Sequence, residues 1–571
     1  MKNFAIKLSG PAGAGMMQAG ETLSKALNRL GFCTLMYPEY PSRIRGGDNN
    51  VLVVFSSEKY LAPVEKIDLL LAFGKENFKA HVGELEGLKP SFAKASSDAK
   101  ALADKSAGKG FEGEEIGLIK IAKELGNPLV ANTAGLGFIF KVLGFGIKVL
   151  EEQIKEEFKE KKEILKLNLE AARKGYEVGV SCGLWDVGRV VRVRVGETIV
   201  NLTGNEALVQ GILGADCEFA AIYPMTPINS ILAMLIKSKV QVFRPEDEIA
   251  GIMAAIGASY AGKRALVATS GGGFSLMIEG IGMAGIAEIP IVIILGQRTG
   301  PSTGMATFSS QSDLNFAIYG GHGEFPRIVL APGDLKEAYF LGQEAFNLAE
   351  HYQVPVILLT DKYLAESRFS EDEGELKVSP ASAEATAGKQ VSQVPEHYKR
   401  YRFTKDGISP RAFPGQAAFL TNSYEHDEYG FSSDDIENRK KMMEKRMGKL
   451  DGLSGGYEPH FVPFAGGTSR GKGFDPEIPM LVGWGSTKEI ILNFLKDYRE
   501  FNYLHISRPW PFPSEAEEIL RKSKRIVSIE GNFSGQMADI IERLISRKVE
   551  RVLKDDGRPF FKRELENRLV S

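Results

Sequence analysis

Cysteine is nearly absent from this sequence of 571 residues, which contains three: Cys33, Cys182 and Cys217. They lie far apart along the chain. Their number and spacing exclude a disulfide framework and a four-cysteine iron–sulfur site made by this chain alone. Any iron–sulfur cluster that works with this chain is therefore expected on another polypeptide.

Charge of one sign and long apolar runs are also lacking. The formal net charge is −2, and Lys and Arg do not cluster with aromatic residues, so nucleic acid is not an expected partner. The longest apolar region, 281–296, is interrupted by Glu288 and Pro290, so no membrane span is predicted. The apolar stretch at the N-terminus is too short for a signal peptide, which leads us to expect a cytoplasmic protein.

The length predicts several domains, because single cores rarely grow beyond about 250–300 residues. In the first, 1–187, apolar strand patterns alternate with helical or loop segments around a glycine-rich turn, GPAGAG. This alternation predicts an α/β unit with a largely parallel sheet. The alternating tract VVRVRV within 184–200 predicts a strand that leads into the next domain.

A second α/β series occupies 200–368, where helical and strand patterns alternate up to the strand VPVILLT. Residues 369–474 lose this rhythm, apart from a charged helix near 435–450, and are interpreted as a connector with arms that contact other subunits. Residues 475–571 regain it and predict a third, smaller α/β domain. The predicted fold class is therefore multidomain α/β.

The glycine turn holds Gly10, Gly13 and Gly15 between a strand and a helix. Backbone N–H groups at such a turn can approach phosphate oxygens. The spacing is not that of a dinucleotide fingerprint, and no acidic residue follows at the position that would hold a ribose. A tight packing turn remains the alternative.

Three further tracts carry polar residues at the ends of predicted strands. In YPMTPINS, two prolines stiffen the turn around Thr226, which either caps the next helix or contacts a substrate. In RPEDEIAGIMAAIGASYAG, three acids crowd a helix start, where a favourable dipole interaction is the ordinary explanation. In GQRTGPSTGMAT, Arg298 follows a buried strand and can offer a planar fork to a carboxylate.

The acidic tract EHDEYG, at 425–430, contains residue types of a metal site. Consecutive side chains rarely converge on one ion, so we interpret it as a loop that contacts a neighbouring chain and predict no metal site in this chain.

Together with ATSGGGFSLMIEG, YRFTKDGISPRAFPG and IEGNFSGQ, these tracts resemble, in order, those of the 2-oxoacid:ferredoxin oxidoreductases. The similarity is to the form in which a gamma-type domain is fused before the alpha subunit, and it covers nearly the whole chain. It implies a gamma-type domain, a domain that binds the pyrimidine ring of thiamine diphosphate, and a domain like the C-terminal domain of transketolase.

The resemblance also implies partners and cofactors. A beta subunit would bring the thiamine diphosphate site with Mg²⁺ and a [4Fe–4S] cluster, in a heterodimer or a dimer of heterodimers. In agreement, the chain has no cysteine quartet and no GDG tract followed by the Asn of a thiamine-diphosphate magnesium site. The implied reaction is coenzyme A-dependent oxidative decarboxylation of a 2-oxoacid, with electrons passing to ferredoxin, or the reverse.

The same resemblance implies roles for individual residues. Glu248 corresponds to the glutamate that hydrogen-bonds the aminopyrimidine ring, and Thr226 and Arg298 to residues that contact the 2-oxoacid. The cofactor side would include Tyr223, Pro224, Gly271 and Gly272. A region near coenzyme A would include Gly10, Gly13, Gly15 and Arg45.

Met225 and Ile228 depart from the family pattern, which has Ile before the threonine and small hydroxyl residues after the second proline. We therefore expect Ile228 to narrow or reshape the substrate pocket. Among 2-oxoacids, 2-oxoglutarate is favoured, with pyruvate and branched-chain or aryl 2-oxoacids as alternatives. A non-catalytic scaffold of the same fold is the alternative function.

Overall fold

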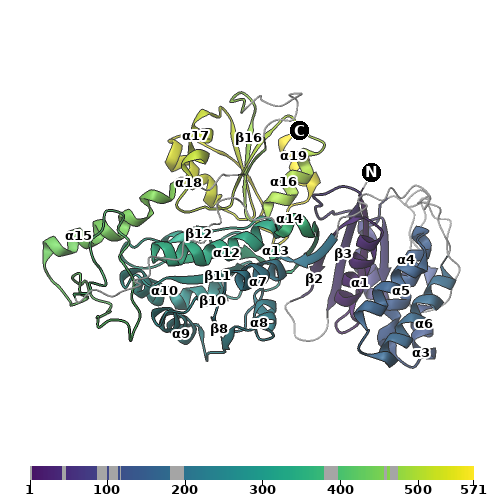
Figure 1. The fold of residues 1–571 in the computed structure, drawn as a ribbon. Coiled ribbons are helices and arrows are strands. Elements are labelled where there is room, and N and C mark those ends of the chain that lie inside the picture. Colours follow the sequence, from purple (N-terminus) through teal and green to yellow (C-terminus); the bar gives the residue numbers. More distant parts are fainter. Residues whose placement is uncertain are drawn as a thin grey trace. The chain divides into compact units, whose positions relative to one another are not determined.

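The computed structural model describes residues 3–41, 47–86, 100–101, 114–115, 117–179, 199–377, 397–454, 460–462 and 474–570. The chain forms two compact units (Figure 1). Unit 1 comprises Met1–Leu202, Glu366–Leu376 and Phe561–Ser571; unit 2 comprises Thr203–Ala365 and Lys377–Phe560. The strand predicted at VVRVRV lies outside the described residues, and the domain boundaries drawn from the sequence stay a prediction.

Unit 1 is built on an eight-stranded sheet. Its strands are, in spatial order, β6 (Glu114–Glu115), β5 (Lys100–Ala101), β4 (Leu69–Ala72), β1 (Phe4–Pro11), β3 (Asp48–Ser56), β2 (Cys33–Glu39), β14 (Arg368–Asp372) and β7 (Ile199–Thr203). The prediction of a largely parallel sheet was wrong, because β3 runs antiparallel to both β1 and β2. The short connection between β2 and β3 leaves no room for the crossover helix that parallel neighbours require.

Helices pack beside this sheet around a core of buried apolar residues. They are α1 (Met16–Arg29), α2 (Lys75–His81), α3 (Leu118–Glu124), α4 (Ala131–Leu143), α5 (Ile147–Glu157), α6 (Lys162–Val178) and the C-terminal α19 (Lys562–Leu569). Helices α4 and α6 approach closely because Gly137 and Gly175 face the partner backbone. None of the helices in the described ranges combines the length and the apolar character of a membrane span.

Unit 2 contains a six-stranded parallel sheet, formed by the strands of the α/β series that its sequence predicts. The strand order is β12 (Ile328–Leu330), β13 (Pro355–Asp361), β11 (Ile291–Gln297), β10 (Ala265–Ser270), β8 (Phe219–Ile222) and β9 (Gln241–Phe243). The associated helices are α7 (Gly204–Gly214), α8 (Asn229–Leu235), α9 (Glu248–Tyr260), α10 (Gly271–Ile286), α11 (Leu314–Tyr319), α12 (Leu335–Tyr352) and α13 (Lys362–Glu366). Helix α7 packs against α12, and α9 packs against α10. The short helix α14 (Glu373–Lys377) follows β14.

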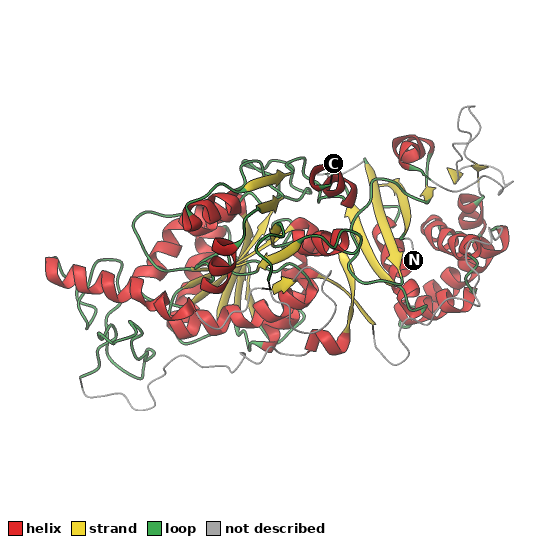
Figure 2. Cartoon of the chain, turned by 90° about the horizontal axis from the view of Figure 1, so that it is seen from above, coloured by secondary structure: helices red, strands yellow, loops and turns green. Residues whose placement is uncertain are grey.

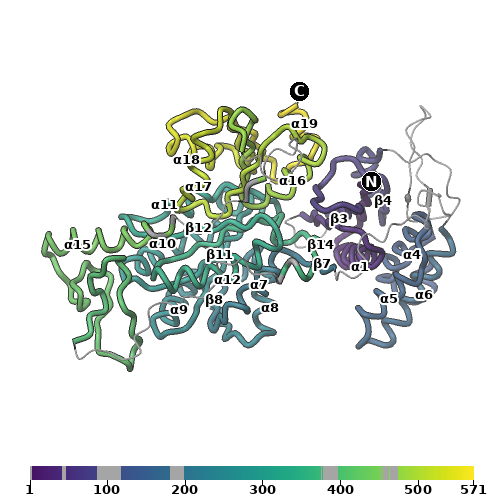
Figure 3. Tube along the Cα trace, turned by 45° about the horizontal axis from the view of Figure 1, so that its top comes forward, coloured from purple at the N-terminus to yellow at the C-terminus, as the bar shows by residue number. Residues whose placement is uncertain are grey.

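A second, five-stranded sheet belongs to the same unit. Its strands are β15 (His460–Val462), β17 (Asn502–Ile506), β16 (Met480–Trp484), β18 (Ile526–Glu530) and β19 (Glu550–Leu553), with helices α16 (Thr487–Leu495), α17 (Ser514–Lys522) and α18 (Gln536–Ile545). The core of unit 2 runs continuously through both sheets, and α11 lies beside α18 (Figure 3). The predicted multidomain α/β class is confirmed.

A buried polar contact joins the two sheets of unit 2. The Gln311 side chain donates to the Trp484 carbonyl at 2.8 Å and accepts from the Gly531 N–H at 2.8 Å. In the same tract, the buried Glu530 carboxylate accepts from the N–H groups of Met537 and Ala538, at the start of α18. The tract IEGNFSGQ therefore attaches the C-terminal sheet to the loop that precedes α11.

The connector forms an arm that contains α15 (Ile436–Met447), which projects at one end of unit 2 (Figure 2). A fully buried ion cluster anchors this arm, since Glu288 pairs with Lys445 at 2.7 Å and with Lys449 at 2.6 Å. Burial alone would raise the pKa of Glu288, but the two ammonium groups hold it well below its ordinary value. In the acidic tract, Glu425 pairs with Arg439 and Arg446 of the same arm, and contact with another chain stays a prediction.

Replacing Glu288 with Gln is expected to destabilise unit 2 by about 3–5 kcal/mol, because two buried ammonium groups lose their counter-ion. The thermal unfolding midpoint of the purified protein measures this loss. Lys449→Met should cost less, because it leaves Glu288 with one neutralising partner, Lys445. Glu518→Gln, which removes half of an exposed pair with Lys522, is the control and should leave the midpoint unchanged. Equal midpoints for Glu288→Gln and this control would contradict the anchoring role.

Candidate functional site

Two loops and a helix start meet at the carboxyl edge of the six-stranded sheet. The loops follow β8 and β11, and α10 begins directly after β10; these strands are parallel neighbours and therefore end at the same edge. In open α/β sheets, ligands bind outside the carboxyl ends of the strands. The predicted residues Tyr223, Thr226 and Arg298 stand in the two loops, and Gly271 is the first residue of α10.

The turn after β8 fixes Thr226. The Thr226–Pro227 peptide is cis, and the next helix, α8, begins at Asn229 with Ile228 as its N-cap residue. The explanation of Thr226 as a helix cap is therefore wrong. The turn packs tightly on Gly296 of β11. A Cβ atom added to Gly296 would lie within 3 Å of both Pro227 and Ile228, so a glycine is needed at this position.

Ile228 is fully buried, and its side chain lies against Gly296. Its expected effect on the shape of the substrate pocket stays a prediction. The apolar side chain fills the space under the turn, where a hydroxyl would need a partner. Met225, the other departure, is half-buried and accepts a hydrogen bond from Ser270 Oγ.

Arg298 and Thr226 are in direct contact. The Arg298 guanidinium donates to the Thr226 carbonyl oxygen at 3.2 Å. Burial lowers the pKa of Arg298 somewhat, although the guanidinium stays half-exposed. Asp313 attracts this guanidinium, and the N–H groups that do not bond Thr226 can bind an anion.

Glu248 is a buried carboxylate with an unused acceptor. The preceding residue, Asp247, is the N-cap of α9 and accepts from the Ala250 N–H at 2.8 Å, which fits the ordinary explanation for an acid at a helix start. Glu246 is exposed. Glu248, in contrast, is 4% exposed, and its Oε1 atom has no hydrogen-bond partner. An unpartnered buried oxygen costs free energy, which suggests that a ligand donor completes it.

The start of α10 forms the common wall of this site. Ser270 contacts Met225, a Cβ atom on Gly271 would lie 2.8 Å from Asp313 Oδ2, and one on Gly273 would lie 2.5 Å from Glu248 Oε1. The two glycines thus let the Asp313 and Glu248 carboxylates lie against one stretch of backbone.

The remaining residues predicted on the cofactor side lie at the open side of this wall. Tyr223 and Pro224 are exposed directly after β8, and Gly272 is exposed with free space where a Cβ atom would stand. The structure therefore brings the predicted cofactor and substrate residues of unit 2 to one edge.

The glycine turn of unit 1 is tightly packed. Gly15 is the N-cap of α1 in the left-handed conformation, with φ 76°, and Gly13 has φ 88°. Asn132 Nδ2 lies where a Cβ atom of Gly15 would stand and donates to the Gly15 carbonyl at 3.3 Å. Gly10 lies in β1, whereas Arg45 lies outside the described residues. A role near coenzyme A stays a prediction.

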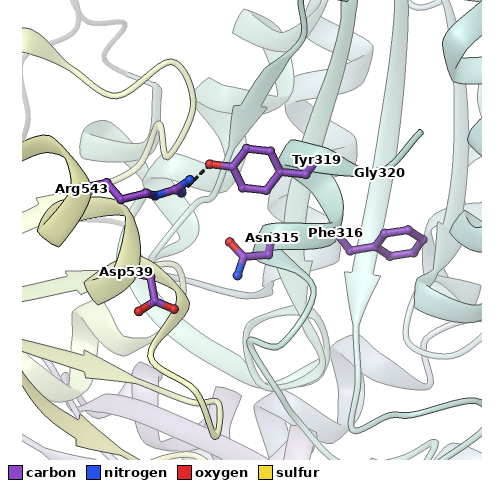
Figure 4. A pocket seen from close by; sticks show the side chains of 6 residues that line it. All are labelled: Asn315, Phe316, Tyr319, Gly320, Asp539 and Arg543. Carbon is purple, nitrogen blue, oxygen red and sulfur yellow. Dashed lines mark hydrogen bonds between the residues drawn. The ribbon is translucent and has the colours of Figure 1, made fainter. Parts of the chain in front are cut away.

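A separate pocket of about 530 Å³ lies between α11 and α18, lined by Asn315, Phe316, Tyr319, Gly320, Asp539 and Arg543 (Figure 4). Arg543 points toward Tyr319 and donates to its hydroxyl at 2.5 Å. Asp539 pairs with Arg551. The charges that line this pocket thus have partners, and the pocket contains none of the predicted site residues.

The structure adds two residues that sequence reasoning missed, Gly273 and Asp313. Gly273 lies in the tract ATSGGGFSLMIEG, whose run of glycines was a usable signal. Asp313 follows a loop rich in Gly, Pro and Ser, and nothing in its local pattern distinguishes it from a surface acid.

Comparisons with known proteins agree with this geometry. The family described as pyruvate flavodoxin/ferredoxin oxidoreductase, thiamine diphosphate-binding, matches residues 210–445, and the family described as pyruvate ferredoxin/flavodoxin oxidoreductase matches residues 5–178. The 2-oxoacid:ferredoxin oxidoreductase subunit alpha of Sulfolobus sp is 32% identical over 620 residues, which cover 99% of this chain and 96% of the relative.

The chain belongs to the 2-oxoacid:ferredoxin oxidoreductase family. It is an alpha subunit of that enzyme class and contains its thiamine diphosphate-binding domain. The 2-oxoglutarate oxidoreductase subunit KorA of Mycobacterium tuberculosis is 28% identical, over 99% of this chain and 91% of the relative. A solved 2-oxoglutarate:ferredoxin oxidoreductase from Magnetococcus marinus, with 2-oxoglutarate, coenzyme A and succinyl-CoA bound, is 28% identical, has a TM-score of 0.84 and covers 100% of this chain and 99% of that chain.

The added Cβ of Gly273→Ala would lie within 3 Å of both Thr269 Oγ1 and Glu248 Oε1, so the substitution is expected to displace both side chains. We expect it to lower the oxidoreductase activity of the assembled enzyme by at least about 100-fold, since misplacing a reacting group by about 1 Å has costs of this order. Reduction of a viologen dye by a 2-oxoacid measures it. Gly282→Ala, in the same helix, is the matched control, because no atom lies within 4 Å of its added Cβ. Full activity in Gly273→Ala would contradict the proposed placement of Glu248.

Proposed function

We propose that this chain supplies the pyrimidine-binding half of an active site that converts 2-oxoglutarate, coenzyme A and oxidised ferredoxin into succinyl-CoA, CO₂ and reduced ferredoxin, or catalyses the reverse. The observation that carries the proposal is Glu248, a buried carboxylate with an unpartnered oxygen at the carboxyl edge of a parallel sheet. Such an edge is where this type of sheet binds its ligands.

The described residues fit thiamine diphosphate. Glu248 Oε1 is an acceptor without a donor, and it lies against the bare backbone of Gly273. The neighbouring Gly272 has open space where a side chain would stand. Tyr223 and Pro224 offer exposed apolar surface nearby, in the loop that follows β8. These five residues would hold the pyrimidine side of the cofactor.

When bound, thiamine diphosphate supplies the carbon nucleophile that attacks the 2-keto carbon. Glu248 holds a proton-accepting oxygen in a dry position, where a hydrogen bond is stronger than in water. Glu248 is buried at the start of α9 against Gly273 of α10, so this carboxylate would hold a proton for a ring nitrogen of the cofactor away from bulk water.

Arg298 and Thr226 are proposed to bind the 2-oxoacid. The guanidinium can pair with the substrate carboxylate through its free N–H groups, while its bond to the Thr226 carbonyl fixes its direction. The Thr226 hydroxyl, on the same turn, would donate to the keto oxygen. The preference for 2-oxoglutarate is supported by the name of the Mycobacterium tuberculosis relative and by the substrate in the Magnetococcus marinus structure.

The outer face of α9 and α10 supports a shared active site. Both helices are apolar on nearly every side, yet Ile249, Met253 and Leu276 are 52%, 46% and 49% exposed. A helix that is apolar all round normally lies buried. We propose that a beta subunit covers this face and brings the diphosphate-binding half, with Mg²⁺ and a [4Fe–4S] cluster, beside Glu248.

Coenzyme A is proposed to contact the gamma-type unit, and ferredoxin to accept electrons from the cluster of the beta subunit. Coenzyme A is bound in the Magnetococcus marinus structure, which supports its part in the reaction. The glycine turn Gly10–Gly15 is the proposed contact region in this chain.

Glu248→Gln should abolish viologen reduction with every 2-oxoacid while leaving the assembly intact, because an amide cannot accept and return the proton. Size-exclusion chromatography of the variant complex checks its assembly. Substrate preference is tested separately: among a panel of 2-oxoacids, 2-oxoglutarate should give the wild-type complex its highest kcat/KM. Asp247→Asn, which keeps the helix cap, is the neighbouring control. Activity retained by Glu248→Gln would refute the role of this carboxylate.

Met253→Asp should prevent assembly, since it places a charge in the apolar face of α9. The wild-type chain is expected to co-purify with a partner of roughly 30 kDa that carries a brown iron–sulfur chromophore, a size typical of one or two domains. The variant should purify alone and colourless. Leu129→Asp, at an exposed apolar residue of unit 1 that is 58% exposed, should still co-purify with the partner.

A further inference from the structure

Asp313 is a carboxylate at the site to which no function has been assigned. It stands between the loop after β11 and the start of α11, half-buried, with its Oδ2 atom against the backbone of Gly271. Within the described residues, no hydrogen bond or ion pair reaches its carboxylate oxygens. A carboxylate at a ligand site that has no hydrogen-bond or ion-pair partner can change its protonation state when a charged ligand binds nearby.

The backbone around Asp313 is held from both sides. Its N–H donates to Gln297 Oε1 at 3.0 Å, and Gln297 ends β11, directly before Arg298. Gln536, from the C-terminal sheet layer, donates to the Ser312 carbonyl at 2.7 Å and accepts from the Asn315 N–H at 2.8 Å. These bonds hold the backbone that carries Asp313 beside the end of β11, where Arg298 follows Gln297.

Among the residues packed around Asp313, Arg298 is the charged group that attracts its carboxylate. From α10 the neighbour is Gly271, and from the C-terminal layer it is the neutral Gln536, whereas Glu248 faces Gly273 further along α10. Burial raises the pKa of Asp313 to about 6, against the attraction of Arg298, which lowers it. The carboxylate therefore changes charge close to neutral pH.

We propose that Asp313 tunes the binding of the 2-oxoacid by competing with the substrate carboxylate for the positive charge of Arg298, and that it takes up a proton when the substrate binds. The proposal rests on the proposed role of Arg298 in binding the substrate carboxylate. An anionic Asp313 neutralises the guanidinium and repels the incoming anion, whereas a protonated Asp313 does neither. Asp313 is thus a positioning residue that acts through Arg298.

The sign of the pH dependence follows from this competition. Below the pKa of Asp313 the carboxyl is neutral, and Arg298 holds the substrate without a competitor. Above it the substrate must displace or protonate the carboxylate, so KM for the 2-oxoacid should rise by about tenfold between pH 6 and pH 8.

The test compares the wild-type complex with Asp313→Asn and Asp313→Glu. Asp313→Asn should bind the 2-oxoacid more tightly at pH 8 and lose the rise of KM with pH, while Asp313→Glu keeps the rise. Titration calorimetry of 2-oxoglutarate binding at pH 7, in buffers of different ionisation enthalpy, should show uptake of most of one proton by the wild-type complex and none by Asp313→Asn. Glu324→Gln, which removes an exposed acid of the same unit, should resemble the wild type.

The Arg298→Gln variant tests the role of Arg298 in substrate binding separately from the role of Asp313. If Arg298 binds the substrate carboxylate, this variant raises KM at every pH. Unchanged KM in Arg298→Gln would defeat the proposed role of Arg298 itself. A raised KM in Arg298→Gln, together with a wild-type pH slope and proton uptake in Asp313→Asn, would overturn the inference about Asp313 alone.

Discussion

The site depends on the close approach of two carboxylates to the backbone at the start of α10, which only glycine permits. Where β10 ends and α10 begins, a Cβ atom on Gly271 would lie 2.8 Å from Asp313, and one on Gly273 would lie 2.5 Å from Glu248. Because β8, β10 and β11 run parallel, Thr226 and Arg298 are delivered to the same edge. A side chain at either glycine would push the carboxylates away from the groups they serve.

The apolar helices α9 and α10 link this geometry to assembly. One side of each helix buries the core of unit 2, and α9 also begins with Glu248. The other side leaves Ile249, Met253 and Leu276 in the open. The same elements therefore position the proposed proton-exchanging carboxylate and offer a surface for a partner, so a partner that covers this surface would also exclude water from Glu248.

The sequence predicted the elements of unit 2 well, because each buried strand and amphipathic or apolar helix has a local pattern. It predicted the sheet of unit 1 wrongly, since strand direction depends on which strands pair, and β3 enters between β1 and β2. Thr226, Arg298 and Glu248 were named from motifs. The packing of Ile228 on Gly296 could not be predicted, because Gly296 lies on a strand far along the chain.

The local sequence does not predict the different roles of the three neighbouring acids Glu246, Asp247 and Glu248. All three crowd a helix start, and the helix dipole favours an acid at each of them. Only tertiary structure divides their roles, since Asp247 caps α9, Glu246 meets solvent and Glu248 is buried with an oxygen unpaired. The same holds for Asp313, whose importance comes from β11, α10 and α18 and from nothing in its own segment. Burial and partners, which are properties of the fold, convert an ordinary acid into a group that can exchange a proton.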